Sequence, residues 1–248
     1  MHIISKLLSV ILILMMSCTH KNKDTHDKKI EKSINDKYNI ELKPSYNENG
    51  FIEFIMLDGY KINEIPFEIT DLDSLNHLRI DGVKLSLLPE WVTEIDQLRY
   101  LYLIDVPLVE FPSNLQKANI IENFCLSGSN ITELPSEFNF PKLKILRLTN
   151  SPFINLPLIN RNSDQEALTL YLKKTNITEI PKEYSKYQIR RFSIEDNRKL
   201  DHMDNLFGTY DSLKEVNIGY RGHTKFPMES FKKCYNLEVL SLTDQGLW

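Results

Sequence analysis

The sequence predicts an α/β repeat fold, a right-handed solenoid of about nine stacked units with a concave parallel β-sheet and short helical or irregular convex segments. Two observations carry this prediction. Seven of the 11 prolines recur at intervals of 22 to 24 residues, apart from one gap of 46 that spans two periods. The 248 residues include 34 Leu and 26 Ile but only two Ala, whereas a helical bundle would use far more of that strong helix former.

Four apolar positions keep the same phase as the prolines, which gives the repeat L-x-x-L-x-L-x-x-x-x-I-x-x-L-P. The units begin at residues 52, 75, 98, 121, 143, 167, 189, 213 and 237. In L-x-L, the two apolar side chains point to one face of a strand, and each further unit adds a parallel strand about 4.8 Å away. The proline fixes φ and lacks an N–H donor, so it excludes a regular helix at the bend that follows the turn.

This pattern resembles the leucine-rich repeat family, and in particular its 23-residue class with an apolar-Pro pair, over residues 51–248. The family's usual Asn, three residues after the second strand Leu, is present only as Asn197. Buried backbone in the other turns must therefore find other partners, and we expect irregular turns near Val83 and Val106. The resemblance implies a non-enzymatic module that binds a protein partner on its concave face.

The first 18 residues have the features of a targeting signal. His2 and Lys6 precede a short apolar run, and Ser17-Cys18 is followed at once by polar residues. Because this segment resembles a bacterial lipoprotein box, we interpret residues 1–17 as a signal peptide and Cys18 as a lipidation site. The alternative is a plain signal peptide or an N-terminal anchor with an incidental Cys. Several acyl chains would hold the protein firmly to a bacterial membrane of the cell envelope, in the periplasm or on the surface.

The two ends of the repeat array differ in sequence. Residues 18–36 are polar, with charges of alternating sign and no apolar period, which predicts a flexible lipid-anchored tether. In residues 37–50, the alternation from Tyr38 to Leu42 predicts an N-terminal capping strand followed by a turn. At the other end, Leu247-Trp248 stops in mid-repeat, which predicts an exposed edge strand that is either covered by Trp248 or free to pair with a partner. The oligomeric state stays open.

Residues between and beside the strand leucines form columns on the predicted concave face. In units two to seven these columns carry three arginines and three tyrosines, residue types enriched at binding hot spots. The predicted partner-binding residues are Arg79, Tyr100, Tyr102, Arg147, Tyr171 and Arg191. The alternative is that these side chains stack on one another. We expect Cys125 to face solvent in the same columns, about 19 Å along the stack from Cys234 and too far away for a disulfide.

Composition and motifs exclude several classes of function. The net charge of −4 argues against nucleic-acid binding, and the three cysteines include no CxxC pair for zinc. The HExxH, GxSxG and phosphate-cradling motifs are absent, so we expect neither an enzyme nor a cofactor. Two binding hypotheses remain: an unknown protein ligand, or a carbohydrate such as peptidoglycan stacked on Tyr100, Tyr102 and Tyr171. A hydrolase site assembled from neighbouring repeats has no support in the sequence.

Overall fold

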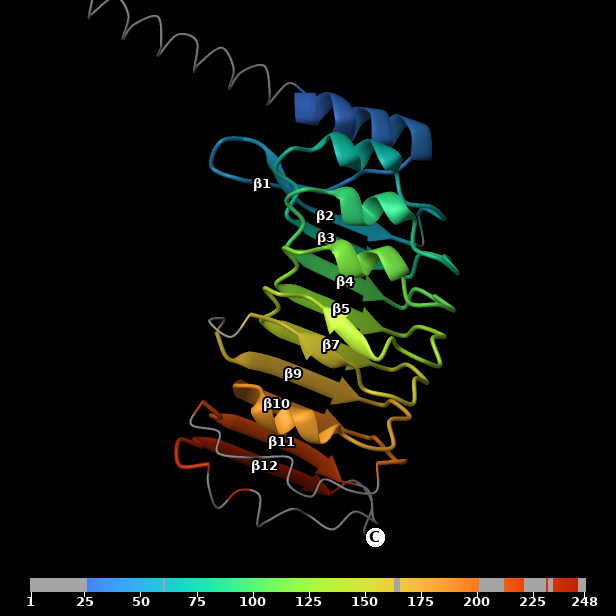
Figure 1. Ribbon diagram of the computed structural model, residues 1–248. Coiled ribbons are helices and arrows are strands. Elements are labelled where there is room, and N and C mark those ends of the chain that lie inside the picture. The colour runs from blue at the N-terminus through green and yellow to red at the C-terminus, as the bar shows by residue number, and fades with distance from the viewer. Residues whose placement is uncertain are drawn as a thin grey trace, which may run out of the picture.

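The computed structural model describes residues 26–59, 61–162, 166–200, 212–220, 231 and 234–244. Within these ranges, ten strands form one sheet in the order β1-β2-β3-β4-β5-β7-β9-β10-β11-β12 (Figure 1). Nine of them are parallel, one in each predicted repeat: β2 (Ile52–Asp58), β3 (His77–Asp81), β4 (Tyr100–Ile104), β5 (Asn123–Ser127), β7 (Ile145–Thr149), β9 (Leu168–Lys173), β10 (Ile189–Glu195), β11 (Glu215–Tyr220) and β12 (Val239–Asp244). The predicted signal peptide and Cys18 lie outside the described residues.

The pairing register confirms the repeat phase. One column of mutually paired apolar residues runs through all nine parallel strands: Ile55, Leu78, Leu101, Phe124, Leu146, Leu170, Phe192, Val216 and Leu240. All but Leu240 are fully buried. No single unit encloses its own apolar face, so the continuous core exists only because the units stack. The chain is therefore a leucine-rich-repeat-like solenoid with a period of about 23 residues.

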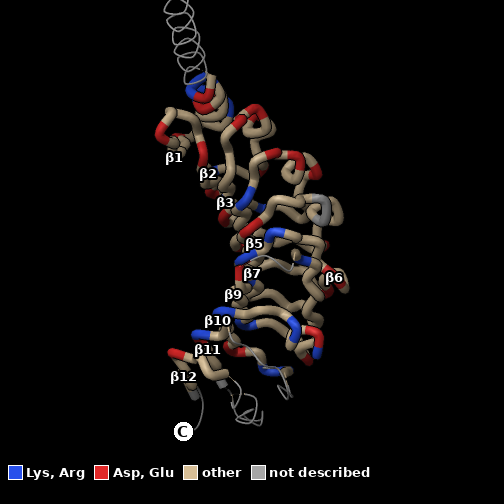
Figure 2. The backbone as a smooth tube through the Cα atoms, turned by 60° about the vertical axis from the view of Figure 1, so that its left-hand side comes forward, with Lys and Arg blue, Asp and Glu red and all other residues tan. Residues whose placement is uncertain are grey.

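The outer side of the solenoid holds short elements of two kinds. Four 3₁₀ helices each begin directly after a proline of the repeat: η1 (Phe67–Asp71), η2 (Glu90–Glu94), η3 (Ser113–Lys117) and η4 (Lys182–Lys186). In the fourth and fifth units, the strands β6 (Glu137–Asn139) and β8 (Leu158–Asn160) pair in parallel instead. Sequence reasoning did not anticipate this second sheet. In Figure 2 the main sheet lines the inside of a shallow arc, and β6 lies on its outside.

The turns after β3, β4, β5, β7, β9 and β10 repeat one backbone geometry. Six residues at this position have φ between 50° and 70°: Gly82, Asp105, Gly128, Asn150, Lys174 and Asp196. The irregular turns expected near Val83 and Val106 are therefore absent from the structure. Both valines are fully buried and replace the missing polar residue with apolar packing.

Other turns satisfy their backbone by hydrogen bonds between units, as the sequence predicted. The Ser129 N–H donates to Ser151 Oγ at 3.0 Å. The Thr175 N–H donates to Asn197 Oδ1, also at 3.0 Å. Asn197 in turn donates to the carbonyl of Leu172 at 3.1 Å. Small hydroxyl side chains thus share the role that the resemblance assigns to asparagine alone.

The N-terminal end is capped by a helix over residues 26–38, so the prediction of a flexible tether is wrong for residues 26–36 (Figure 1). The helix buries Ile30 and Ile34 against the first unit. Its Asp27 is also buried and accepts a hydrogen bond from the backbone N–H of Ile52 at 2.8 Å. Apolar residues four positions apart lie on one helix face, a signal that the charged composition obscured.

The strand at this end is also displaced from its predicted place. Residues 40–44 have no regular structure, and the cap strand is β1 (Ser45–Tyr46), which pairs antiparallel with β2.

At the far end of the described sheet, β12 exposes Leu240 and Leu242 by 41% and 50%. Pairing of that edge with a partner stays a prediction.

Candidate binding face

The six predicted binding residues share one surface of the main sheet. Arg79, Tyr102, Arg147 and Tyr171 occupy the column between the buried strand residues, and Tyr100 and Arg191 occupy the column before it. Alternation along each strand points the core side chains to one surface and these six to the other. We call this second surface, inside the arc of Figure 2, the inner face.

The N-terminal part of the inner face, on β2 to β4, is held by rings. The His77 ring packs edge-on against Phe54 with centroids 4.6 Å apart, and against Tyr102 at 4.9 Å. The Tyr100 ring is tilted relative to His77, with centroids 5.3 Å apart. Burial, together with the nearby Arg79 charge, lowers the pKa of His77 below its usual value, so the imidazole is neutral at pH 7. Arg79 pairs with Asp81 at 2.6 Å.

Strand β5 joins the two parts of the face through Asn123. Its Nδ2 donates to the Tyr102 hydroxyl at 2.7 Å, and its Oδ1 accepts from Arg147 Nη1 at 3.2 Å. Cys125 lies in register between Tyr102 and Arg147 and is only 7% exposed, so the expectation that it faces solvent is wrong. Burial raises the pKa of its thiol to about 11. Cys125 and Cys234 are both free thiols.

The C-terminal part of the face, from β7 to β11, is held by charges and hydrogen bonds. The Arg147 guanidinium lies 4.7 Å from the centroid of the Tyr171 ring. Arg191 Nη1 donates to the Tyr171 hydroxyl at 3.2 Å, and Arg191 Nε donates to Glu215 Oε2 at 2.6 Å. The hydrogen bond to Tyr171, and to a smaller extent the one to Glu215, raises the pKa of Arg191. Asn217 donates to the other Glu215 oxygen at 2.8 Å.

A line of contacts therefore crosses the inner face from Phe54 on β2 to Asn217 on β11. The alternative in which the arginines and tyrosines contact one another is thus present in the structure, and it fixes their orientations. Sequence reasoning missed three of the connecting residues: His77, Asn123 and Glu215. All three stand in the same repeat columns as the predicted residues, so the register was a usable signal for them.

Other kinds of site are not apparent in the part of the chain that the structure describes. There, no three His, Cys, Asp or Glu side chains gather closely enough to hold a metal ion. None of the helices in the same ranges has the length and apolar character needed to cross a membrane.

Comparison with known proteins agrees on the fold. No family model and no curated protein matches the chain. Among solved structures it is similar to a plant ice-binding protein, with a TM-score of 0.61 and 17% identity, covering 90% of this chain and 79% of that one. It is also similar to a leucine-rich repeat protein of Leptospira interrogans, with a TM-score of 0.47 and 19% identity over 82% of this chain and 64% of that one. At 17% identity, the likeness to the ice-binding protein shows the fold alone.

Proposed function

We propose that this chain is a non-enzymatic binding module that holds a protein partner on its inner face at a bacterial cell envelope. The observation that carries the proposal is the line of contacts from Phe54 to Asn217, which holds the three predicted tyrosines together with Arg147 and Arg191 on one surface. Tyr and Arg offer a large contact area with directed hydrogen bonds and dominate binding hot spots. Side chains already fixed by neighbours lose less rotamer freedom when a partner binds.

The contacts favour a protein ligand over a carbohydrate. Sugar rings stack on free aromatic faces, but Arg147 covers one face of Tyr171. The rings of Tyr100 and Tyr102 pack against His77. What remains accessible is a mixed surface of guanidinium groups, hydroxyls and ring edges, which suits the varied chemistry of a protein surface.

Capture of a partner from solubilised bacterial envelopes by the full chain tests this proposal. Arg147→Glu reverses a charge at the centre of the face, and we expect it to abolish capture of a specific protein. Lys142→Glu makes the same reversal at an exposed residue before β7 and serves as the matched control. Equal capture by both variants would overturn the proposal. Binding to a glycan array that Tyr102→Ala abolishes would establish the carbohydrate hypothesis instead.

The envelope location rests on the sequence of residues 1–18. We propose that Cys18 carries the lipid anchor and that the capped solenoid begins within about ten residues of it. Metabolic labelling with a palmitate analogue should mark the wild-type chain and not Cys18→Ser. Labelling that persists in Cys18→Ser would contradict the anchor without affecting the binding face.

A further inference from the structure

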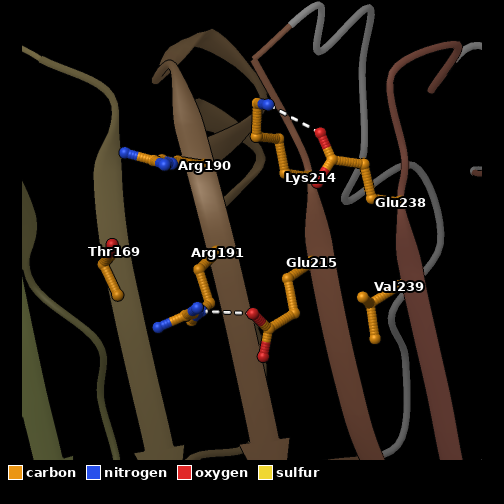
Figure 3. Close-up of a pocket in the computed structure, with 7 residues that line it drawn as sticks. All are labelled: Thr169, Arg190, Arg191, Lys214, Glu215, Glu238 and Val239. Carbon is orange, nitrogen blue, oxygen red and sulfur yellow. Dashed lines mark hydrogen bonds and ion pairs between the residues drawn. The ribbon is translucent and has the colours of Figure 1, made fainter.

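A pocket of about 300 Å³ opens on the sheet surface over β9 to β12 (Figure 3). Its lining is mostly charged and comprises Thr169, Arg190, Arg191, Lys214, Glu215, Glu238 and Val239. Two of these residues, Arg191 and Glu215, belong to the line of contacts described above. The pocket is therefore continuous with the proposed binding face and is small enough to hold one side chain.

Arg190 lies beside a register shift in the sheet. The β9–β10 ladder pairs Ile189 with Leu168 and then Arg191 with Thr169, so that Arg190 has no counterpart on β9. Two consecutive arginines line the pocket on β10, as Lys214 and Glu215 do at β11 and Glu238 and Val239 do at β12 (Figure 3).

Arg190 belongs to a column of charged residues that precedes the strands, and its positive charge contributes to lowering the pKa of Glu238. The equivalent column farther up the sheet is neutralised, because Glu122 pairs with both Arg99 at 3.2 Å and Lys144 at 3.1 Å. On β9, however, that column holds Leu168, which is fully buried. Within the described ranges, the Arg190 guanidinium forms no direct ion pair, and the Glu238 carboxylate is paired with Lys214.

The other charges of the pocket are already matched. Lys214 pairs with Glu238 at 2.6 Å, and Arg191 pairs with Glu215 at 2.6 Å. The lining thus holds three cations and two carboxylates, with Arg190 as the excess cation. Arg191 still has spare donors, since a guanidinium has five N–H groups and only two are engaged, by Glu215 and Tyr171.

We propose that this pocket binds a carboxylate side chain, Asp or Glu, of the protein partner. Figure 3 shows both guanidinium groups extending from β10 toward β9, with Thr169 between them. A carboxylate entering there would accept a charge-assisted hydrogen bond from one guanidinium and lie in the positive field of the other, and the Thr169 hydroxyl can donate a further hydrogen bond. The inference rests on the proposed function, because it assigns part of the partner's chemistry to one end of the same face.

Side-chain NMR of the full chain tests the proposal directly. The probes are a capped tripeptide with glutamate between two glycines, the matching glutamine peptide and inorganic phosphate. We expect only the glutamate peptide to shift the Arg190 and Arg191 Nε–Hε resonances saturably. Arg190→Gln should weaken that binding about tenfold, the cost of losing a charged hydrogen-bond donor. Arg99→Gln, in the equivalent column but paired with Glu122, should leave it unchanged.

Three results would overturn the carboxylate pocket: equal shifts from the glutamine peptide, equal weakening by Arg99→Gln and Arg190→Gln, or saturable binding of phosphate alone. Partner capture separates this failure from that of the proposed function. Capture that Arg147→Glu abolishes and Arg190→Gln leaves intact would retain the binding face and remove the pocket. Specific glutamate binding with no captured protein would retain the carboxylate site and remove the protein-binding function.

Discussion

The two parts of the inner face are stabilised by different chemistry. On β2 to β4, the rings of Phe54, Tyr100 and Tyr102 surround His77 with centroid separations of 4.6 to 5.3 Å. From β7 to β11, Arg191 links a tyrosine hydroxyl to a carboxylate, and its side chain remains 45% exposed. The inner-face columns keep the same phase in both parts, because the register shift at Arg190 precedes Arg191 and its paired neighbours, so the difference between the parts lies in the side chains.

This contrast shows how one repeat can supply two kinds of surface. Ring packing removes apolar area from water and is not weakened by charge screening. Exposed ion pairs contribute little stability and are screened by salt, but they leave spare donors at the surface. We therefore regard the ring part as structural support, and the charged part as the region that selects a partner by charge.

The largest expected effect concerns the junction between the two parts. If Tyr102 and Arg147 close over Cys125, its buried thiol, with a pKa of about 11, is scarcely ionised at pH 8. We expect iodoacetamide to modify Cys125 on the order of 100-fold more slowly in the native chain than in the urea-unfolded chain. Peptide mapping by mass spectrometry follows this cysteine separately from the others.

Tyr102→Ala provides the control for that measurement. Removing the ring opens one side of Cys125, so alkylation should become several-fold faster while the protein stays folded. A native rate equal to the unfolded rate would show that the two parts do not meet over β5. The solvent-facing position first expected for Cys125 would then be correct.

The second prediction concerns the free energy of unfolding in urea. It compares the loss caused by a substitution in the ring part with the loss caused by one in the charged part. Tyr102→Ala removes a half-buried ring and leaves Asn123 Nδ2 without its acceptor, which should cost about 2 kcal/mol of stability. Arg191→Gln removes an exposed pair and should cost about 0.5 kcal/mol.

Salt distinguishes the stability lost in Tyr102→Ala from the stability lost in Arg191→Gln. In 1 M NaCl the Arg191→Gln loss should shrink, because the screening length falls to about 3 Å, while the Tyr102→Ala loss persists. Tyr102→Phe keeps the ring and should lose only about 1 kcal/mol. Equal salt dependence for the two parts would remove the distinction between them.

The sequence predicted the strands well because their signal is periodic. The phase of Leu78 and its equivalents defined all nine parallel strands, and stacking then placed Tyr102 and Arg147 on one surface. The register could not show that Cys125 is buried, since its cover comes from the large side chains of the flanking units. The sequence also carries no signal for the extra residue at Arg190, because the register shift depends on the hydrogen bonds between β9 and β10.

Departures from the repeat were harder to predict. The helix over residues 26–38 has a charged composition, and only Ile30 and Ile34 mark the face that packs on the first unit. The strands β6 and β8 occupy positions where other units have 3₁₀ helices, and their single buried residues, Phe138 and Ile159, give no periodic signal. In both places, packing against a neighbouring unit decides the local structure.

The smallest expected effect is a pH dependence confined to the ring part. His77 has a folded-state pKa below the 6.5 of the free side chain, so the unfolded chain binds its proton first as pH falls. Stability should therefore decline as pH drops below about 6.5, until the folded-state pKa is reached. Glu68 and Glu238, whose pKa values are lowered from 4.5, titrate at lower pH and leave this window clear. Between pH 7.5 and pH 5.5, the free energy of unfolding in urea should fall less for His77→Gln than for the wild type. An identical fall in both proteins would show that the rings do not exclude water from the imidazole.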